Sequence, residues 1–500
     1  IICKAYNESR GRHIKINFHM PSLLIIIIIG GIFLALLSLI DKALAVGVIF
    51  IVFLASVTLF FINKIKEKET IKFLSALFLI VFLIHIVMVI FVYYTNFQPF
   101  SNGRGDYKEY DFVAKEISKR VPTGNFSLEG LPLVHYYPVI ISYIYILTIP
   151  SILIGQLLNA WIVALVAVFV FLLVRQISRS EKEGFIVGLM VGFYPSLAFY
   201  GSLLLKDALV SLLSIIGLLL TLKIIKKFSW LNFSIFYIAL IGVTHLRFYI
   251  GYALILSFII CWFIFSDLRI KKRVIYGIII IILFGFLPRI APLDGAVQGY
   301  MGVGSFRYYL NNRTITGYRE LAYPSQSQMS EETTKTPTSP NSQLEETTKT
   351  PTSPNSQLIG RYSPIAQDSS ITIDTGFEDP ISFLKNISLS FTYALLGPLP
   401  WQLIKSKHLF VLPEIIPWYF LLFFIVKGVI KSIRKDYKII LPLIIFSFIV
   451  FGVLSFYMNN FGIITRIRMP AFLALLCLFP LGYEKLKNIK IPFLEKYLSR

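Results

Sequence analysis

Residues 73–94 read FLSALFLIVFLIHIVMVIFVYY, and this apolar stretch decides the fold. It exceeds the roughly 20 residues that a helix needs to cross about 30 Å of hydrocarbon. Similar runs precede it at Leu23–Leu39 and Ala43–Ile62, and others follow. Hydrophobic residues make up 56% of the 500-residue chain, and charged residues 15%. The sequence therefore predicts a polytopic membrane protein rather than a secreted protein with a signal peptide.

Short basic clusters between the apolar runs orient the chain. Lys and Arg concentrate in cytoplasmic loops of membrane proteins. The clusters lie at residues 4–15, 64–72, 175–182, 223–227, 269–273, 427–438 and 485–490. The net charge of +21 then reflects topology and attraction to anionic headgroups. We expect no nucleic-acid partner.

These clusters all fall on the cytoplasmic side only if the apolar stretch Pro138–Ile149 does not cross the membrane. Proline at both ends and a length of a dozen residues suit a re-entrant or interfacial helix. The same holds for Leu389–Leu403, which Gly397, Pro398 and Pro400 interrupt. Twelve spans remain, at roughly 22–40, 43–62, 73–94, 155–175, 184–200, 208–225, 230–246, 249–267, 274–288, 414–431, 439–457 and 470–484. Both termini are then cytoplasmic.

The predicted fold is an all-α polytopic membrane protein with about 12 transmembrane helices and with juxtamembrane or re-entrant helices on the exoplasmic side. Its expected parts are an N-terminal segment and extra hairpin (1–72), a core (73–288) with a first exoplasmic loop (95–154), an exoplasmic loop (289–412) and the C-terminal helices and tail (413–500). Glu331–Leu344 reads EETTKTPTSPNSQL, and Glu345–Leu358 repeats it. Such polar, proline-containing sequence predicts disorder at 331–358.

An acidic residue follows the run that ends at Tyr94. Residues 104–110 read RGDYKEY and place Asp106 in a glycine-flanked turn before an amphipathic stretch, 107–120. One helical face would hold Tyr107, Tyr110, Ala114 and Ile117. We expect a helix on the membrane surface with the carboxylate near its start, where the helix dipole favours it. Position alone leaves two roles open for Asp106, a helix cap or an active-site acid.

Four patterns, taken in order, resemble a known family. They are residues 105–114 (an acid, then Tyr110 and Ala114), 136–138 (Tyr-Tyr-Pro, before a short apolar helix and the 156–175 run), 192–207 (GFYPSLAFYGSLLLKD) and 465–470 (TRIRMP). Together they resemble the GT-C superfamily of membrane glycosyltransferases. The most similar branch is the bacterial one of protein O-mannosyltransferases and lipid A aminoarabinose transferases (glycosyltransferase family 39). The resemblance covers roughly residues 73–484.

This resemblance implies a specific chemistry in the plasma (inner) membrane. It implies a sugar donor linked to polyprenyl phosphate, an exoplasmic glycan, lipid or protein acceptor, and inversion at the anomeric carbon. By resemblance, Asp106 is the acid that acts at the acceptor. Tyr110, in the same pattern, is expected at the substrate.

The charged residues at the predicted exoplasmic side suit that reaction. An ionised carboxylate can take the acceptor's proton, and cations can stabilise the departing phosphate. The candidate cations at predicted exoplasmic helix ends are Lys206, His245, Arg247, Arg466 and Arg468. We favour Arg247 and the Arg466/Arg468 pair, because guanidinium groups bind two phosphate oxygens. The alternative for each is an interface anchor.

Two interpretations of Asp207 stay open. It could form a self-satisfied ion pair with Lys206, or act as a second active-site carboxylate that holds the acceptor or a divalent cation. No other metal or cofactor is predicted, because the six histidines and three cysteines show no ligand spacing. No phosphate-binding loop ending in Lys-Ser or Lys-Thr is present, which argues against nucleotide-driven transport.

Two other functions compete with the glycosyltransferase. A polysaccharide polymerase or O-antigen-ligase-like enzyme would also have about a dozen spans, a large exoplasmic loop and essential arginines. It would not depend on Asp106. A lipid-linked glycan transporter is disfavoured, because transporters usually show paired repeats and polar residues at mid-membrane.

Overall fold

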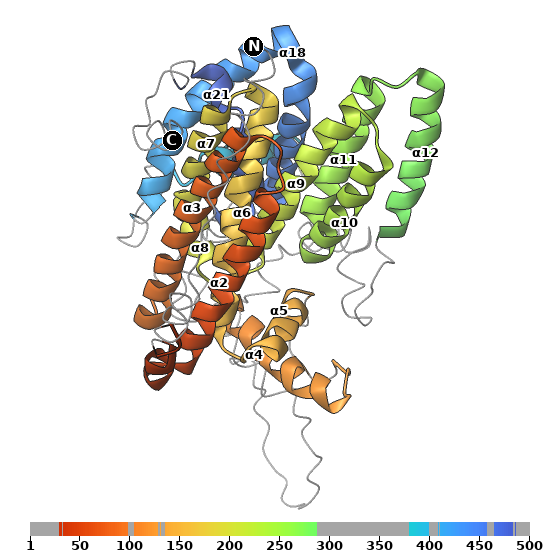
Figure 1. Cartoon of the computed structure of the whole chain (residues 1–500). Coiled ribbons are helices and arrows are strands. Elements are labelled where there is room, and N and C mark those ends of the chain that lie inside the picture. Colours follow the sequence, from red (N-terminus) through yellow and green to blue (C-terminus); the bar gives the residue numbers. More distant parts are fainter. Residues whose placement is uncertain are drawn as a thin grey trace, which may run out of the picture.

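The computed structural model describes residues 30–32, 34–98, 105–128, 131, 136–287, 380–399, 409, 411–457, 465–483 and 486 (Figure 1). The regular structure in these ranges is helical, and they contain no strand. The chain is therefore an all-α protein, as predicted. The tandem repeat at 331–358 lies outside the described residues.

Within these described ranges, seven helices are long and apolar enough to cross a membrane. They are α2 (Lys42–Ile62), α3 (Lys68–Thr95), α6 (Ile152–Ser178), α9 (Asp207–Lys226), α11 (Phe248–Phe265) and two halves of α18 (Leu412–Tyr457), namely Leu412–Arg434 and Asp436–Phe456. The halves meet at Asp436, whose backbone is not helical. An eighth span results if α7 (Glu181–Gly192) and α8 (Pro195–Gly201), bent by 57°, are counted together. This supports a multi-pass membrane protein.

Not all of the twelve predicted spans are confirmed within the described residues. The segments at 230–246 and 274–288 form α10 (Trp230–Leu246) and α12 (Ile270–Phe286), each of 17 residues. The last predicted span is broken into α20 (Met469–Leu476) and α21 (Phe479–Gly482). Helices α10 and α12 lie at the lower limit of the roughly 17–25 residues of a span, and α20 and α21 are shorter. Of the first predicted span, only a helix at Gly30–Ile40 is described.

Two further helices correspond to the apolar stretches that the sequence excludes as spans. Helix α5 (Tyr136–Leu147) has 12 residues and therefore extends only about 18 Å. Helix α17 (Pro380–Leu396) begins nine positions before the predicted stretch and ends before a cis Gly397–Pro398 bond. Helix α4 (Asp106–Arg120) continues into a short 3-10 turn (Val121–Thr123) and packs against α5.

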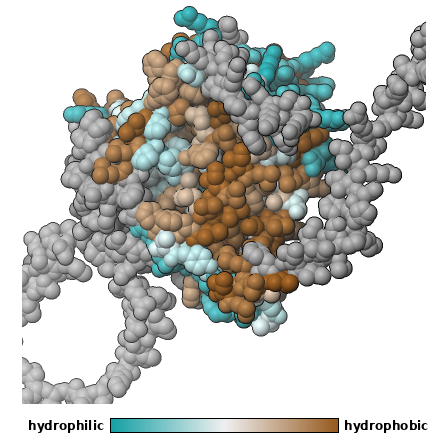
Figure 2. Space-filling view, turned by 60° about the vertical axis from the view of Figure 1, so that its left-hand side comes forward, coloured by the Kyte–Doolittle hydropathy of each residue, from teal (hydrophilic) through white to brown (hydrophobic). Residues whose placement is uncertain are grey.

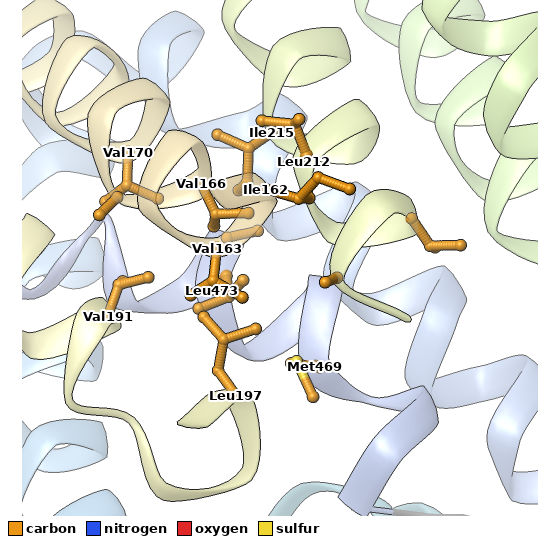
Figure 3. Packing of buried hydrophobic residues seen from close by; sticks show 14 of the residues in the cluster. Ile162, Val163, Val166, Val170, Val191, Leu197, Leu212, Ile215, Met469 and Leu473 are labelled. Carbon is orange, nitrogen blue, oxygen red and sulfur yellow. The ribbon is translucent and has the colours of Figure 1, made fainter. Parts of the chain in front are cut away.

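Helix α6 runs through the middle of the apolar core. Figure 3 shows branched side chains of α6, α7, α8, α9 and α20 pointing toward one another. Those labelled are Ile162, Val163, Val166, Val170, Val191, Leu197, Leu212, Ile215, Met469 and Leu473. This packing fixes the ends of α8 and α9 relative to the segment before α20.

Three glycines allow α7 to approach its neighbours closely. Gly184, Gly188 and Gly192 recur every fourth residue and so share one face of α7. A Cβ on Gly184 would lie 2.9 Å from the carbonyl oxygen of Phe171 in α6. A Cβ on Gly188 would lie 2.6 Å from the Leu77 side chain in α3. Only glycine therefore fits this contact without a shift of the helices.

The basic linkers meet at one end of the bundle. Arg175 pairs with Glu67, and its Nε lies 3.5 Å from the Glu181 carboxylate. Lys438 Nζ lies 3.2 Å from Asp267. Helices α4 and α5 lie at the opposite end of the molecule (Figure 1). The linkers that contain Arg175 and Lys438 thus lie at the end of the bundle opposite α4 and α5.

A band of exposed apolar side chains lies between the two ends. Figure 2 shows apolar residues across the middle of one face, with hydrophilic residues above and below them. Large apolar side chains exposed on the described helices include Phe53, Phe61, Leu83, Ile278, Phe423 and Phe448. A soluble monomer rarely exposes so much apolar surface, so lipid is the solvent that fits this face.

Candidate functional site

Helix α4 presents Asp106 at its first position. Gly105 occupies the N-cap position and makes no side-chain cap. The buried face of α4 consists of Tyr107, Tyr110, Val113, Ala114 and Ile117. It contains all four residues of the predicted face, so the amphipathic helix is confirmed. The Tyr110 ring meets that of Tyr137 in α5 edge-to-face, with centroids 5.7 Å apart.

A buried amide fixes the turn that leads into α9. Asn159 of α6 donates from Nδ2 to the carbonyl oxygens of Leu203 (2.6 Å) and Leu205 (2.8 Å). The Tyr137 hydroxyl donates to Asn159 Oδ1 at 2.8 Å. These bonds satisfy carbonyls that no helix satisfies. They place Lys206 and Asp207 at the N-terminus of α9.

Arg247 occupies the single-residue break between α10 and α11. Its extended backbone separates the two helices and directs its side chain toward α9. One Nη donates to Asp207 Oδ1, and the other to the Tyr249 hydroxyl at 2.6 Å. The Asp207 side chain is only 2% exposed. A buried carboxylate is thus paired with a buried guanidinium, as a charge of this kind requires.

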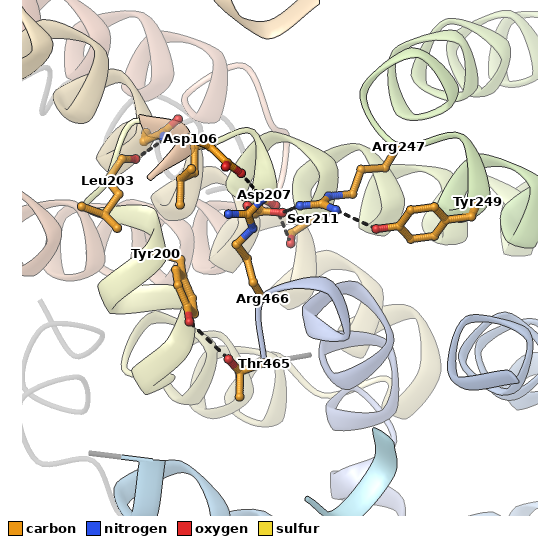
Figure 4. A network of polar contacts seen from close by, with 11 residues as sticks. Asp106, Tyr200, Leu203, Asp207, Ser211, Arg247, Tyr249, Thr465 and Arg466 are labelled. Atoms are coloured by element: carbon orange, nitrogen blue, oxygen red, sulfur yellow. Dashed lines mark hydrogen bonds and ion pairs between the residues drawn. The ribbon is translucent and has the colours of Figure 1, made fainter. Parts of the chain in front are cut away.

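Arg466 joins Asp106 to Asp207 (Figure 4). Its Nη2 donates to Asp106 Oδ2 at 2.7 Å, and its Nε lies 2.9 Å from Asp207 Oδ2. The preceding residue, Thr465, has its hydroxyl 3.2 Å from that of Tyr200. Residues 106, 207, 247 and 466 therefore form one network, although up to 360 positions separate them in the chain.

The electrostatics of this network favour a charged carboxylate. Burial raises the pKa of Asp106, but Arg466, followed by Arg247 and Lys206, outweighs burial and holds that pKa below its ordinary value. Burial and then Arg247 lower the pKa of the Lys206 amine to about 7, although Asp207 and Asp106 act in the opposite direction. The cluster thus holds three basic groups and two acids.

Arg468 belongs to a different cluster. Its side chain is 1% exposed, and its Nη2 donates to Glu414 Oε1 at 2.9 Å. Tyr194 and Ser196 donate to the same carboxylate, and Arg468 also donates to the Gly397 carbonyl oxygen. The predicted Arg466/Arg468 pair is therefore split, because neighbouring residues of one helical turn point in different directions. Arg468 joins α18, α8 and the end of α17.

The other predicted site residues surround the network without completing it. His245 donates from Nδ1 to the Ile241 carbonyl oxygen (2.8 Å), and its ring meets that of Tyr136 with centroids 4.7 Å apart. Tyr110 is buried beside the network. Among the described residues, Asp207 pairs with Arg247 and Arg466 rather than with Lys206. The self-satisfied Lys206–Asp207 pair is therefore not formed.

A divalent cation does not fit at Asp207. Both oxygens of that carboxylate face guanidinium groups, which would repel a metal ion. No group of three His, Cys, Asp or Glu side chains comes together within the ranges that the structure describes. The charges of the site suit an anion better than a cation.

Sequence reasoning missed the residues that support the site. Asn159 and Tyr137 hold the turn before Asp207, and Glu414 neutralises Arg468. One signal was present in the sequence. Asn159 lies inside the apolar run 155–175, and a polar side chain at membrane depth usually has a specific partner.

No protein-family model matches the chain, and no curated protein matches it significantly. The function must therefore be inferred from the residues of the site.

Proposed function

We propose that this protein is an integral-membrane glycosyltransferase of the GT-C type. It transfers a sugar from a polyprenyl-phosphate-linked donor to an exoplasmic glycan, lipid or protein acceptor, with inversion. The observation that carries the proposal is the position of a half-exposed carboxylate, Asp106, beside Arg466 and the Asp207–Arg247 pair at one end of an apolar bundle.

The acidic and the basic side chains of the site have different roles in the proposed reaction. Asp106, whose side chain is 48% exposed, can take the proton of an acceptor hydroxyl that enters from the aqueous side. Arg466, Arg247 and Lys206 can stabilise the negative charge that builds on the leaving phosphate. A guanidinium suits this role because its planar fork meets two phosphate oxygens. Direct attack opposite the phosphate inverts the anomeric carbon.

The placement of the site supports the proposed topology. The basic linkers that contain Arg175 and Lys438 lie at the end opposite Asp106. If those linkers are cytoplasmic, in the plasma membrane of a bacterium, Asp106 faces outward. A lipid-linked donor would then reach the site from the outer leaflet.

The arginines alone also suit an O-antigen polymerase or ligase-like enzyme. The ion pair between Asp106 and Arg466 favours the first proposal, because it places a base within reach of the phosphate-binding group. A polymerase or ligase of this kind would need Arg466 but not Asp106. The two functions therefore differ in one testable residue.

The test is donor turnover by the full chain in lipid nanodiscs. A panel of undecaprenyl-phosphate-linked hexoses and pentoses is supplied with a bacterial envelope fraction as the source of acceptors, and released undecaprenyl phosphate is measured. We expect Asp106→Asn to lower turnover at least about 100-fold, the range for loss of a general base. Glu116→Gln is the matched control, because Glu116 lies on the same helix but pairs with Lys119. Full activity of Asp106→Asn would refute the proposed mechanism.

A further inference from the structure

Arg466 is held by two carboxylates whose surroundings differ. The Asp207 side chain is 2% exposed and also pairs with Arg247. The Asp106 side chain is 48% exposed and contacts Arg466 through one oxygen. Arg466 is thus held by one buried carboxylate, Asp207, and by one partly exposed carboxylate, Asp106. An incoming ligand can replace Asp106 far more easily than Asp207.

The arrangement is unfavourable for catalysis by Asp106. A carboxylate that accepts a charge-assisted hydrogen bond is a weaker base, and Asp106 accepts such a bond from Arg466 at Oδ2. Arg466, Arg247 and Lys206 together keep the pKa of Asp106 low. Opening the ion pair with Arg466 therefore makes Asp106 a stronger base.

An anion with oxygen acceptors is the ligand that can open it. With Lys206 protonated, the network carries three positive and two negative charges, so one positive charge remains to be balanced. A phosphodiester supplies one negative charge and at least two oxygens for the Arg466 fork. It would leave the Asp207 contact intact while it replaces Asp106.

We propose that the phosphate of the lipid-linked donor displaces Asp106 from Arg466, so that Asp106 acts as a base only when the donor is bound. This inference rests on the proposed function. The acceptor's oxygen then bonds to the anomeric carbon as its proton passes to Asp106. The carbon–oxygen bond to phosphate breaks, and its electron pair leaves with the phosphate, which stays on Arg466. Before the donor binds, Asp106 stays paired with Arg466 and is a weaker base.

The first measurement is the affinity of undecaprenyl phosphate for the full chain in nanodiscs. Asp106→Asn removes the competing carboxylate and should tighten binding about fivefold, which is the factor for one partly exposed ion pair. Arg466→Gln should weaken binding, and Glu116→Gln, which removes the same charge elsewhere on α4, should leave it unchanged. Unchanged or weaker binding by Asp106→Asn would overturn the displacement.

The second measurement separates displacement from simple loss of negative charge. Carbodiimide modification of Asp106, followed by mass spectrometry of the peptide that contains it, is compared with and without undecaprenyl phosphate. Displacement predicts faster modification with the lipid, because the freed carboxylate protonates more readily. Slower or equal modification would contradict it. If the lipid does not bind the wild-type protein at all, the proposed function itself fails, so the two failures are distinguishable.

Discussion

At the residue scale, the site depends on how each basic side chain is neutralised. Arg247 and Arg466 share the buried carboxylate of Asp207, and Arg468 has its own partner in Glu414. Burial and Arg247 both disfavour the charged form of Lys206 and lower its pKa to about 7. The charge of this amine therefore changes near pH 7.

That amine predicts a pH dependence for donor binding. A phosphodiester keeps its single negative charge, so donor affinity follows the charge of Lys206, with Arg247, Arg466, Asp106 and Asp207 as the charged groups around it. Below a pH of about 7 the amine is protonated and attracts the donor; as pH rises through about 7 this attraction is lost. We expect kcat/KM for the donor to fall above that pH.

The control for this pH profile is Lys206→Arg. An arginine stays protonated throughout the range, so the fall in kcat/KM above neutrality should flatten. Identical profiles for the wild type and Lys206→Arg would show that another group titrates.

At the element scale, the site is a meeting point of helix ends. One charged side chain comes from each of three places: the break between α10 and α11, the start of α4 and the segment before α20. The N-terminus of α9 supplies two, Lys206 and Asp207. Asn159 and the close packing of α6 against α7 hold these ends in place. The positions of the charged side chains at the site thus depend on contacts inside the bundle.

The glycine face of α7 predicts a large effect from a small substitution. Gly184→Ala would place a methyl group 2.9 Å from the Phe171 carbonyl oxygen, so α6 and α7 must move apart. We expect a loss of about 1–3 kcal/mol in the free energy of unfolding, which is the usual range for overpacking. Thermal unfolding in detergent would measure it.

The matched control is Gly285→Ala in α12. No atom lies within 4 Å of the Cβ position at Gly285 among the described residues. Alanine should therefore be neutral or slightly stabilising there, because it restricts the unfolded chain. Equal unfolding temperatures for the two variants would contradict the proposed close packing.

At the scale of the whole molecule, sequence periodicity and composition predicted the fold class and the helices but not their partners. The run 73–94 became α3, and the face of α4 was confirmed because both follow from local spacing. Seven or eight of the twelve predicted spans are confirmed in the described residues, since apolar composition does not fix helix length. Asp106 and Arg466 could not be paired from sequence, because 360 positions separate them and only packing brings them together.

The proposed function depends on where the phosphate of the donor binds. The most direct measurement is a cryo-electron microscopy structure of the full chain with undecaprenyl phosphate. We expect a phosphate oxygen within about 4 Å of the Arg466 guanidinium. Asp106 should then lie beside the phosphate and no longer contact Arg466. Phosphate at the opposite, basic end near Arg175, or more than about 10 Å from Asp106, would contradict the proposed site.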